Sequence, residues 1–276
     1  MTIRTMTVED LQMVLGWAAD EGWNPGLEDA KAFYMADPSG FLIKEVDGQA
    51  AAAISVVNHD DNFAFLGLYL CKSAFRGQGH GMEVWRAGIA HAGVRSIGLD
   101  GVPDQEDNYA RSGFVKYGST VRYEGQIAPM ADPRIRAASP GDRDKIIARD
   151  ITSSGIKRTA FATAWFENGP TRQTIVLAED TDILGFATFR RCRRGSKIGP
   201  VYAATGTDAR SLLAANPFAT SDEPCFVDVY DHGAPLAALV KSMNFKATFE
   251  TARMFSGTQP VSDPARFEAI ATMELG

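Results

Sequence analysis

The first hydrophobic positions of the chain recur at the spacing of an amphipathic helix. Apolar residues from Leu11 to Ala18 lie three or four positions apart, and Thr7 stands before them with Asp10 three residues later. A hydroxyl at the N-cap and a carboxyl three positions on can cap a first helical turn together. The pattern therefore predicts a helix that begins after Thr7 and ends before the turn at residues 22–26.

The pattern then changes to the alternation and apolar runs of strands. Asp47 and Gly48 form a tight-hairpin signal between the first two runs. The run at 63–71 is apolar on both faces, which is typical of a central strand. We predict strands at 40–46, 50–57, 63–71, 96–100 and from 114, and helices at 27–35, 81–92 and 105–112.

The order of elements then repeats after an aperiodic, proline-containing segment at 124–134. We predict strands at 135–137, 174–179, 183–191, 197–203, 226–230 and 245–252, and helices at 140–150, 209–215 and 235–243. The sequence thus predicts a mixed α/β protein of two related domains, 1–126 and 135–276, joined by a linker at 127–134.

Composition narrows the class of protein. The 276 residues are 45% hydrophobic and 22% charged, which is globular composition with room for two domains. The net charge of −6 argues against nucleic acid or an anionic membrane as the main partner. The three cysteines lie far apart, so we expect neither a disulfide scaffold nor a metal site. No apolar run is long enough for a membrane span, and we expect a cytoplasmic protein.

Residues 76–81, Arg-Gly-Gln-Gly-His-Gly, follow the predicted central strand and open a helix. Alternating glycines let the backbone turn sharply and approach a ligand. The free N–H groups at a helix start, beside the positive end of its dipole, bind phosphate or pyrophosphate without a cationic side chain. The segment has neither the lysine of a P-loop nor the glycine spacing of a Rossmann fingerprint, because position 82 is Met82.

This loop resembles the cofactor loop of the GNAT superfamily of N-acetyltransferases. The family pattern Arg/Gln-x-x-Gly-x-Gly/Ala is matched by Arg76, Gly79 and Gly81. A second feature of that family, a Tyr four residues ahead of a Gly-Phe pair, is matched by Tyr109 before Gly113. The order of elements up to about residue 123 also matches.

The resemblance implies acetyl-CoA as the acyl donor and a splayed pair of parallel strands, near Leu70 and near Leu99, that makes room for it. Backbone N–H groups of residues 78–81 would bind the pyrophosphate, and the pantetheine arm would lie along 68–71. The N–H of Leu70 would polarise the thioester carbonyl. The predicted cofactor-binding residues are Leu68, Leu70, Cys71, Arg76, Gly77, Gln78, Gly79, His80 and Gly81.

Thioester aminolysis needs a neutral amine and a proton for the departing thiolate. An alkylamine of pKa about 10.4 is mostly protonated at neutral pH, so a base or desolvation is required. The resemblance implies Tyr109 as the general acid. It leaves the base open between Asp100, at the end of a strand, and Glu21, before a loop that borders the acceptor pocket. A covalent route through Cys71 is disfavoured, because a strand cysteine is more often a small buried residue.

Trp23 and Asn24, on the Pro-Gly loop, are predicted to contact a small-molecule primary amine. In the second half, 226–228 echoes 98–100 but no Arg-x-x-Gly-x-Gly follows its fourth strand. We therefore expect a degenerate GNAT-like domain that walls the acceptor pocket, with Asp228, Tyr230 and His232 as candidate contacts. The basic run 190–194 is typical of a solvated loop.

Two other functions remain open at this point. One is a non-catalytic acyl-CoA sensor or interaction module, and the other is acetylation of a protein lysine or N-terminus. The sequence does not decide the oligomeric state.

Overall fold

The N-terminal half folds as the sequence predicts, with one strand added. The computed structural model describes residues 2–231, 235–262 and 266–276. The capping box of Thr7 and Asp10 is formed, and positive φ angles at Asp47 and Gly48 make the predicted hairpin turn. In order, the elements are β1 (Thr2–Thr5), α1 (Val8–Asp20), α2 (Asp29–Ala36), β2 (Phe41–Val46), β3 (Gln49–Asn58), β4 (Phe63–Cys71), α3 (His80–Ala92), β5 (Ser96–Gly101), α4 (Glu106–Arg111) and β6 (Val115–Gly125).

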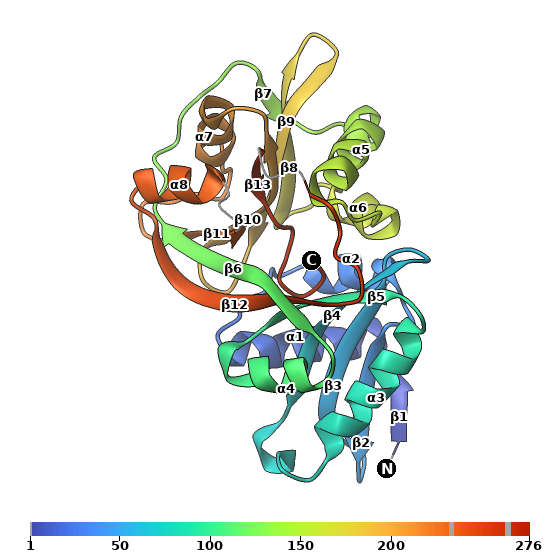
Figure 1. Ribbon diagram of the computed structural model, residues 1–276. Helices are drawn as coiled ribbons and strands as arrows, with labels where there is room; N and C mark the ends of the chain where they lie inside the picture. The colour runs from blue at the N-terminus through green and yellow to red at the C-terminus, as the bar shows by residue number, and fades with distance from the viewer. Residues whose placement is uncertain (1, 232–234, 263–265) are drawn as a thin grey trace.

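The C-terminal half repeats this order of elements (Figure 1). Its helices α5 and α6 stand where α1 and α2 stand in the first half, and a short final strand follows the last long one. The elements are β7 (Ile135–Ala137), α5 (Arg143–Ser154), α6 (Thr159–Trp165), β8 (Arg172–Glu179), β9 (Asp182–Arg191), β10 (Ser196–Ala203), α7 (Gly206–Ala214), β11 (Cys225–Asp231), α8 (Pro235–Ser242), β12 (Lys246–Ser256) and β13 (Phe267–Ala269).

All these strands join one continuous sheet, in which the halves exchange their long strands. The order is β1-β2-β3-β4-β5-β12-β6-β11-β10-β9-β8-β7, with β13 beside β10. Strand β12 thus lies between β5 and β6, and β6 lies between β12 and β11. The two long strands cross the middle of the molecule in Figure 1. The boundary predicted between 126 and 135 stays a prediction, but neither half completes its own sheet.

Two equivalent ion pairs fix the exchanged strands. Arg253 of β12 donates to both carboxylate oxygens of Asp100 on β5, at 2.8 and 2.6 Å. Arg122 of β6 donates to both oxygens of Asp228 on β11, at 2.7 and 2.8 Å. All four side chains are buried. Bidentate pairs of this kind hold one register between strands, and each joins one half to the other.

Helices cover both faces of the sheet. In the first half α3 packs on one face, while α1 and α2 lie on the other, where α2 packs against α6 of the second half. One core cluster accordingly contains residues of both halves, from Met6 to Leu275. Separate clusters lie under α3 and under α7 and α8. No helix within the described ranges has the length and apolar character needed to cross a bilayer.

Most differences from the sequence-based expectation concern short elements. Strand β1, helix α6 and strand β13 were not predicted. The basic run was expected to be solvated, which is wrong for Arg190. That side chain is 2% exposed, pairs with the buried Asp29 and stacks on Trp165 at 4.4 Å.

The exchanged strands make a prediction about stability. Replacing Arg253 with Met leaves the Asp100 carboxylate buried without its arginine, although the Thr120 hydroxyl still donates to it at 2.7 Å. Loss of one partner of a buried ion pair costs about 3–5 kcal/mol. We expect the free energy of unfolding in urea to fall by that amount, whereas Arg193→Met, which breaks an exposed pair with Asp20, changes it little. Equal effects of the two substitutions would contradict this account.

Candidate functional site

A cavity opens where β4 and β5 separate. These strands pair in parallel from Phe63 with Ser96 to Leu66 with Leu99, and no pairing follows within the described chain. The cavity measures about 440 Å³. It is lined by Glu21, Trp23, Leu66, Gly67, Leu68, Tyr69, Leu70, Cys71, Arg76, Leu99, Asp100, Val102, Asp104, Gln105, Tyr109, Arg122, Phe249, Thr251, Met273 and Glu274.

A bulge in β4 accompanies the separation. Two residues of β4, Leu68 and Tyr69, lie opposite one residue of β3, and Leu68 has a φ of 45°. Such a conformation costs a non-glycine residue about 1–2 kcal/mol and bends the strand. Beyond the bulge, residues 68–71 border the cavity on the side where β5 has moved away. The predicted splayed pair is therefore present, and it starts after Leu66 and Leu99.

The glycine loop lies at the end of β4 and leads into α3. Gly77 and Gly79 have φ angles of 77° and 86°, and a Cβ built on either would meet no atom within 4 Å. Glycine is therefore required by the backbone conformation rather than by crowding. No side chain caps α3, and no hydrogen bond from the N–H of Gln78 or Gly79 is found among the residues described. This open cradle fits a phosphate group.

The side chains of the loop hold it in place. Arg76 donates to the Cys71 carbonyl at 2.9 Å and pairs with Glu21 at 2.6 Å. Gln78 donates to the Ala74 carbonyl at 3.0 Å. His80 is 5% exposed, and its ring packs edge-on against Phe75, so the ring is buried beside the loop.

Tyr109 lies at the opposite wall of the same cavity. Its ring stacks on Trp85 at 5.8 Å and lies close to Gly101, where a Cβ would collide with it. Burial, with a smaller contribution from Tyr69, raises the pKa of Tyr109 to about 12. The hydroxyl therefore stays protonated at neutral pH, which suits a proton donor.

The two carboxylates considered as bases lie at this cavity, but both have partners. Both Asp100 oxygens accept from Arg253, and one also accepts from Thr120. Glu21 is about half exposed and pairs with Arg76. The environment of Asp100 is that of a structural counter-ion, whereas Glu21 stays a candidate at the cavity mouth.

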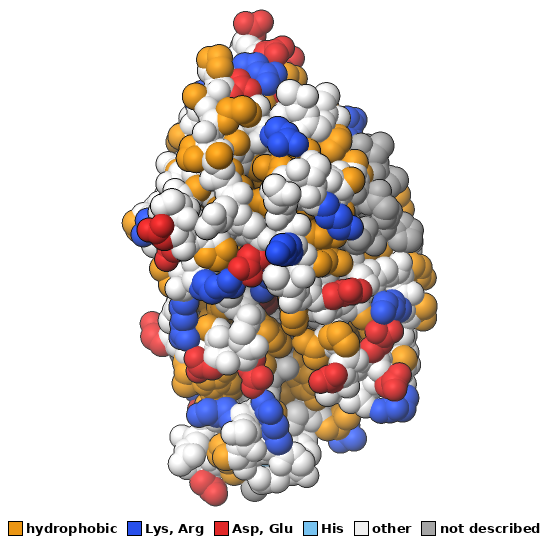
Figure 2. Space-filling view, turned by 90° about the vertical axis from the view of Figure 1, so that its left-hand side faces the viewer, with side chains coloured by type: hydrophobic (Ala, Val, Ile, Leu, Met, Phe, Trp, Pro, Cys, Tyr) orange, Lys and Arg blue, Asp and Glu red, His pale blue; other side chains and the backbone are white. Residues whose placement is uncertain are grey.

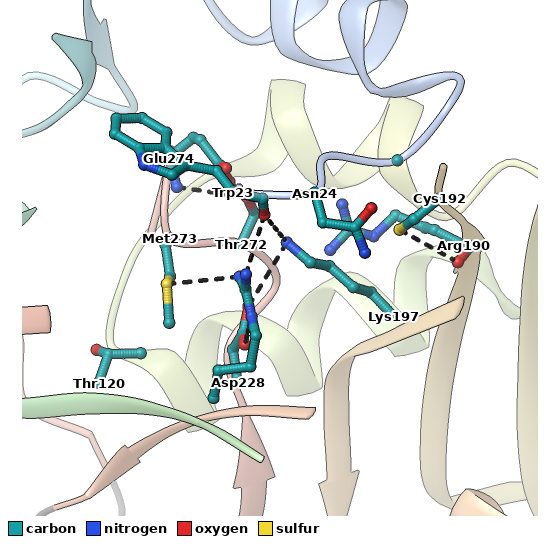
Figure 3. A network of polar contacts seen from close by, with 12 residues as sticks. Trp23, Asn24, Thr120, Arg190, Cys192, Lys197, Asp228, Thr272, Met273 and Glu274 are labelled. Atoms are coloured by element: carbon teal, nitrogen blue, oxygen red, sulfur yellow. Dashed lines mark hydrogen bonds and ion pairs between the residues drawn. The ribbon is translucent and has the colours of Figure 1, made fainter. Parts of the chain in front are cut away.

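Of the predicted acceptor contacts, Trp23 lines the cavity. Its carbonyl accepts from Arg122 at 3.0 Å and from Lys197 at 2.9 Å (Figure 3). Asn24 is turned to Arg194, donating to its carbonyl at 2.9 Å. Asp228 is engaged by Arg122 behind the cavity wall. Of these three residues, only Trp23 lines the cavity.

Tyr230 lines a second cavity, of about 260 Å³. This cavity contains Arg158, Arg253 and the end of the chain, and Tyr230 does not appear in the lining of the first. His232, the remaining candidate, lies outside the described residues.

Sequence reasoning missed several residues of the first cavity, among them Arg122, Met273 and Glu274. Arg122 comes from β6, and Met273 and Glu274 come from the segment after β13. The pattern around Arg122 marks a strand but not its orientation, and the last residues of the chain carry no motif. Burial raises the pKa of the Glu274 carboxyl above its usual range, although Lys197 and other cations oppose the shift.

Comparisons with known proteins agree with this geometry. Residues 8–114 match the family model described as "Acetyltransferase (GNAT) family", and residues 146–266 match "Acetyltransferase (GNAT) domain". Holothin acyltransferase of Pseudoalteromonas sp. (strain SANK 73390) is 32% identical over 284 aligned positions, covering 100% of this chain and 94% of that protein. The chain belongs to the GNAT acetyltransferase family.

Solved structures show the same fold. A Pyrococcus horikoshii protein described as an acetyltransferase superposes with a TM-score of 0.81 at 21% identity, over 100% of this chain and 95% of that one. A tandem GNAT protein from the clavulanic acid biosynthesis pathway gives a TM-score of 0.62 at 13% identity, over 94% and 99%. With a GNAT model matched in each half and an acyltransferase relative over the whole chain, the protein is a tandem GNAT-type acyltransferase.

The second GNAT half has the same strand separation, but the chain itself fills it. Strands β10 and β11 pair in parallel from Ser196 to Ile198 and then separate. Strand β13 pairs with β10 there, and the Ile270 N–H donates to the Asp228 carbonyl of β11 at 3.0 Å. An internal strand thus takes the place that a ligand strand would need.

The start of α7 is also less suited to a phosphate group than the start of α3, because it is capped by a side chain. The Thr205 hydroxyl accepts from the Asp208 N–H at 3.1 Å, so a side chain caps the helix. The Asp208 carboxylate in the first turn repels a phosphate group. These features support the expectation of a degenerate second half.

The glycine loop makes a prediction about affinity. Gly79→Asp places a carboxylate at the free N–H groups of the helix start, where it repels phosphate. We expect the Kd for coenzyme A, measured by calorimetry, to rise at least about tenfold, equivalent to about 1.4 kcal/mol.

Gly48→Asp is the matched control, because Gly48 has a φ of 76° and equally open surroundings in the β2–β3 turn. It carries the same backbone strain and the same charge. A Kd left unchanged by Gly79→Asp, or raised equally by Gly48→Asp, would place the phosphates elsewhere.

Proposed function

We propose that this protein transfers an acetyl group from acetyl-CoA directly to a primary amine of a small molecule. The observation that carries the proposal is the open gap beside β4, which ends at an uncapped helix start in the first half. The corresponding gap of the second half is filled by β13. The first half would therefore carry the reaction.

The residues present fit coenzyme A. The N–H groups of 78–81 would hold the pyrophosphate, and the backbone of 68–71 would hold the pantetheine arm as an added strand. Bound acetyl-CoA supplies an acyl group activated as a thioester. The N–H of Leu70, or of a neighbour in the bulge, would polarise the carbonyl oxygen of that group. The Tyr109 hydroxyl would give its proton to the departing sulfur.

The size and walls of the cavity support a small acceptor. A volume of about 440 Å³ lies within the usual range for small-molecule sites, about 300–1,000 Å³. Trp23 and Phe249 supply aromatic walls, and Met273 closes the side of the second half. On the face drawn in Figure 2, positive and negative side chains are interspersed, which offers no single-sign tract to a charged polymer.

The direct test is release of free thiol from acetyl-CoA in the presence of an amine panel. The panel contains holothin, after the name of the curated relative, simple primary alkylamines, and peptides with a free lysine or N-terminus. We expect turnover with one or more small amines. Turnover restricted to peptides would favour protein acetylation, and binding of acetyl-CoA without turnover of any amine would favour a sensor.

Tyr109→Phe tests the proton donor. Loss of a positioned general acid lowers rates by about 10²–10⁴-fold, and a good thiolate leaving group places the expected fall in kcat near the lower end, about 10²-fold. The Kd for acetyl-CoA should stay the same, because the ring and its stacking on Trp85 remain.

Tyr117→Phe serves as the control, since Tyr117 lies on β6 at the second cavity and is 40% exposed. An unchanged kcat in the Tyr109 variant would show that solvent, or another group, protonates the sulfur.

A further inference from the structure

A buried carboxyl reaches the first cavity from the opposite end of the chain. Glu274 lies five residues after β13, is 4% exposed and lines the cavity together with Met273. Figure 3 shows Glu274 and Trp23 close together, on the side of the network away from Asp228. No residue assigned a role so far supplies an available base at this place.

The backbone holds Glu274 in position from both sides. Before it, Ile270 is bonded to β11, and β13 is paired with β10. After it, the Leu275 carbonyl lies 2.8 Å from the Nε2 atom of His59. At Glu274 itself the carbonyl packs so closely on Gly67 of β4 that a Cβ at Gly67 would collide with it. The carboxyl is therefore placed next to the point where β4 and β5 separate.

The carboxyl oxygens of Glu274 are not equivalent. Oε2 accepts a short hydrogen bond from the Thr272 hydroxyl. Oε1 accepts no hydrogen bond and forms no ion pair within 4.0 Å with any described residue. Since it is also not one of the fully buried atoms without a partner, this oxygen keeps some accessible surface. Asp100 and Asp228, in contrast, have both oxygens occupied by an arginine. Glu274 thus presents a buried carboxylate oxygen without a partner among the described residues, whereas Glu21 and Asp104 of the same lining are exposed.

We propose that Glu274 is the catalytic base that accepts the proton of the acceptor amine, an inference that rests on the proposed amine acetylation. The Glu274 carboxylate takes one proton from the ammonium form of the acceptor and releases it to water. The neutral nitrogen then forms the C–N bond to the acyl carbon and loses a second proton to water. The C–S bond breaks with its electron pair on sulfur, which takes a proton from the Tyr109 hydroxyl. Water returns a proton to Tyr109, so the products are the amide, the free thiol and one proton.

The surroundings suit this role. Burial raises the pKa of Glu274, which brings a carboxyl closer to the operating range of a base near neutral pH. The charged groups that act on it come from four elements: Arg122 on β6, Lys197 on β10, Arg190 on β9 and Asp29 at the start of α2. The three cations lower the pKa and Asp29 raises it, with burial as the largest cause.

The test compares Glu274→Gln with Glu268→Gln, which makes the same change in β13 at the second cavity. With the best amine of the panel, we expect Glu274→Gln to lower kcat about 10²-fold or more, with the Kd for acetyl-CoA unchanged. Because the base acts when deprotonated, kcat/KM of the wild type should fall as pH drops through the pKa of Glu274. That acidic limb should be lost in Glu274→Gln and kept in Glu268→Gln.

Two further readouts separate a base from a structural carboxylate. The defect of Glu274→Gln should shrink for an acceptor amine of low pKa, which is already neutral, and formate should partly restore Glu274→Ala. Independently of turnover, carbon-13 NMR of glutamate-labelled protein should show one carboxyl that titrates above the ordinary range and disappears in Glu274→Gln. Its midpoint should coincide with the acidic limb.

The outcomes are distinct. A wild type that turns over no amine removes the proposed function, and this inference with it. A wild type that turns over an amine, with a Glu274→Gln variant of unchanged rate and pH profile, overturns this inference alone. A folded Glu274→Gln variant whose defect is equal for all amines and is not relieved by formate also overturns it, because a structural role would give that result.

Discussion

The parting of two parallel strands is the constraint on which the rest of the structure depends. After Leu66 and Leu99, β4 and β5 no longer pair, and the bulge at Leu68 turns the backbone of β4 toward the gap. Backbone polar groups at such an edge need a partner, either a ligand or another strand. The first half leaves its gap open beside an uncapped helix start. The second half closes the equivalent gap with β13, so one fold gives an open cavity in one copy and a structural joint in the other.

The exchange of β6 and β12 makes the two halves depend on each other. Each long strand completes the sheet of the other half, and each is held by a bidentate arginine–aspartate pair, Arg253 with Asp100 and Arg122 with Asp228. The segment after β13 extends this dependence to the site. It is anchored in the second half and passes Gly67 of the first, so the segment that follows the gap-filling strand builds part of the wall of the other cavity. The second half therefore contributes to the site although its own gap is filled.

Local patterns in the sequence predicted the parts of the molecule that local physics decides. The capping box at Thr7, the hairpin at Asp47 and Gly48 and the positive-φ glycines of the loop 76–81 are set by neighbouring residues, and all are formed. Tyr109, which the family resemblance pointed to, lines the cavity. Partners far apart in sequence were not predictable in this way. Asp228 was predicted to contact the pocket by analogy with Asp100, but its carboxylate accepts from Arg122 instead. Arg190 was expected to be solvated, but it forms a buried ion pair with Asp29 of the other half. Strand β13 has three residues and Glu274 has no motif, so neither carries a periodic signal.

The number of acyl-donor sites tests the central claim most directly. Calorimetric titration of the full chain with coenzyme A counts them without knowledge of the acceptor. An open gap in one half and a filled gap in the other predict one molecule of coenzyme A per chain. Two molecules per chain would show that β13 does not close the second gap, and no binding would show that the opening beside β4 is not the donor site.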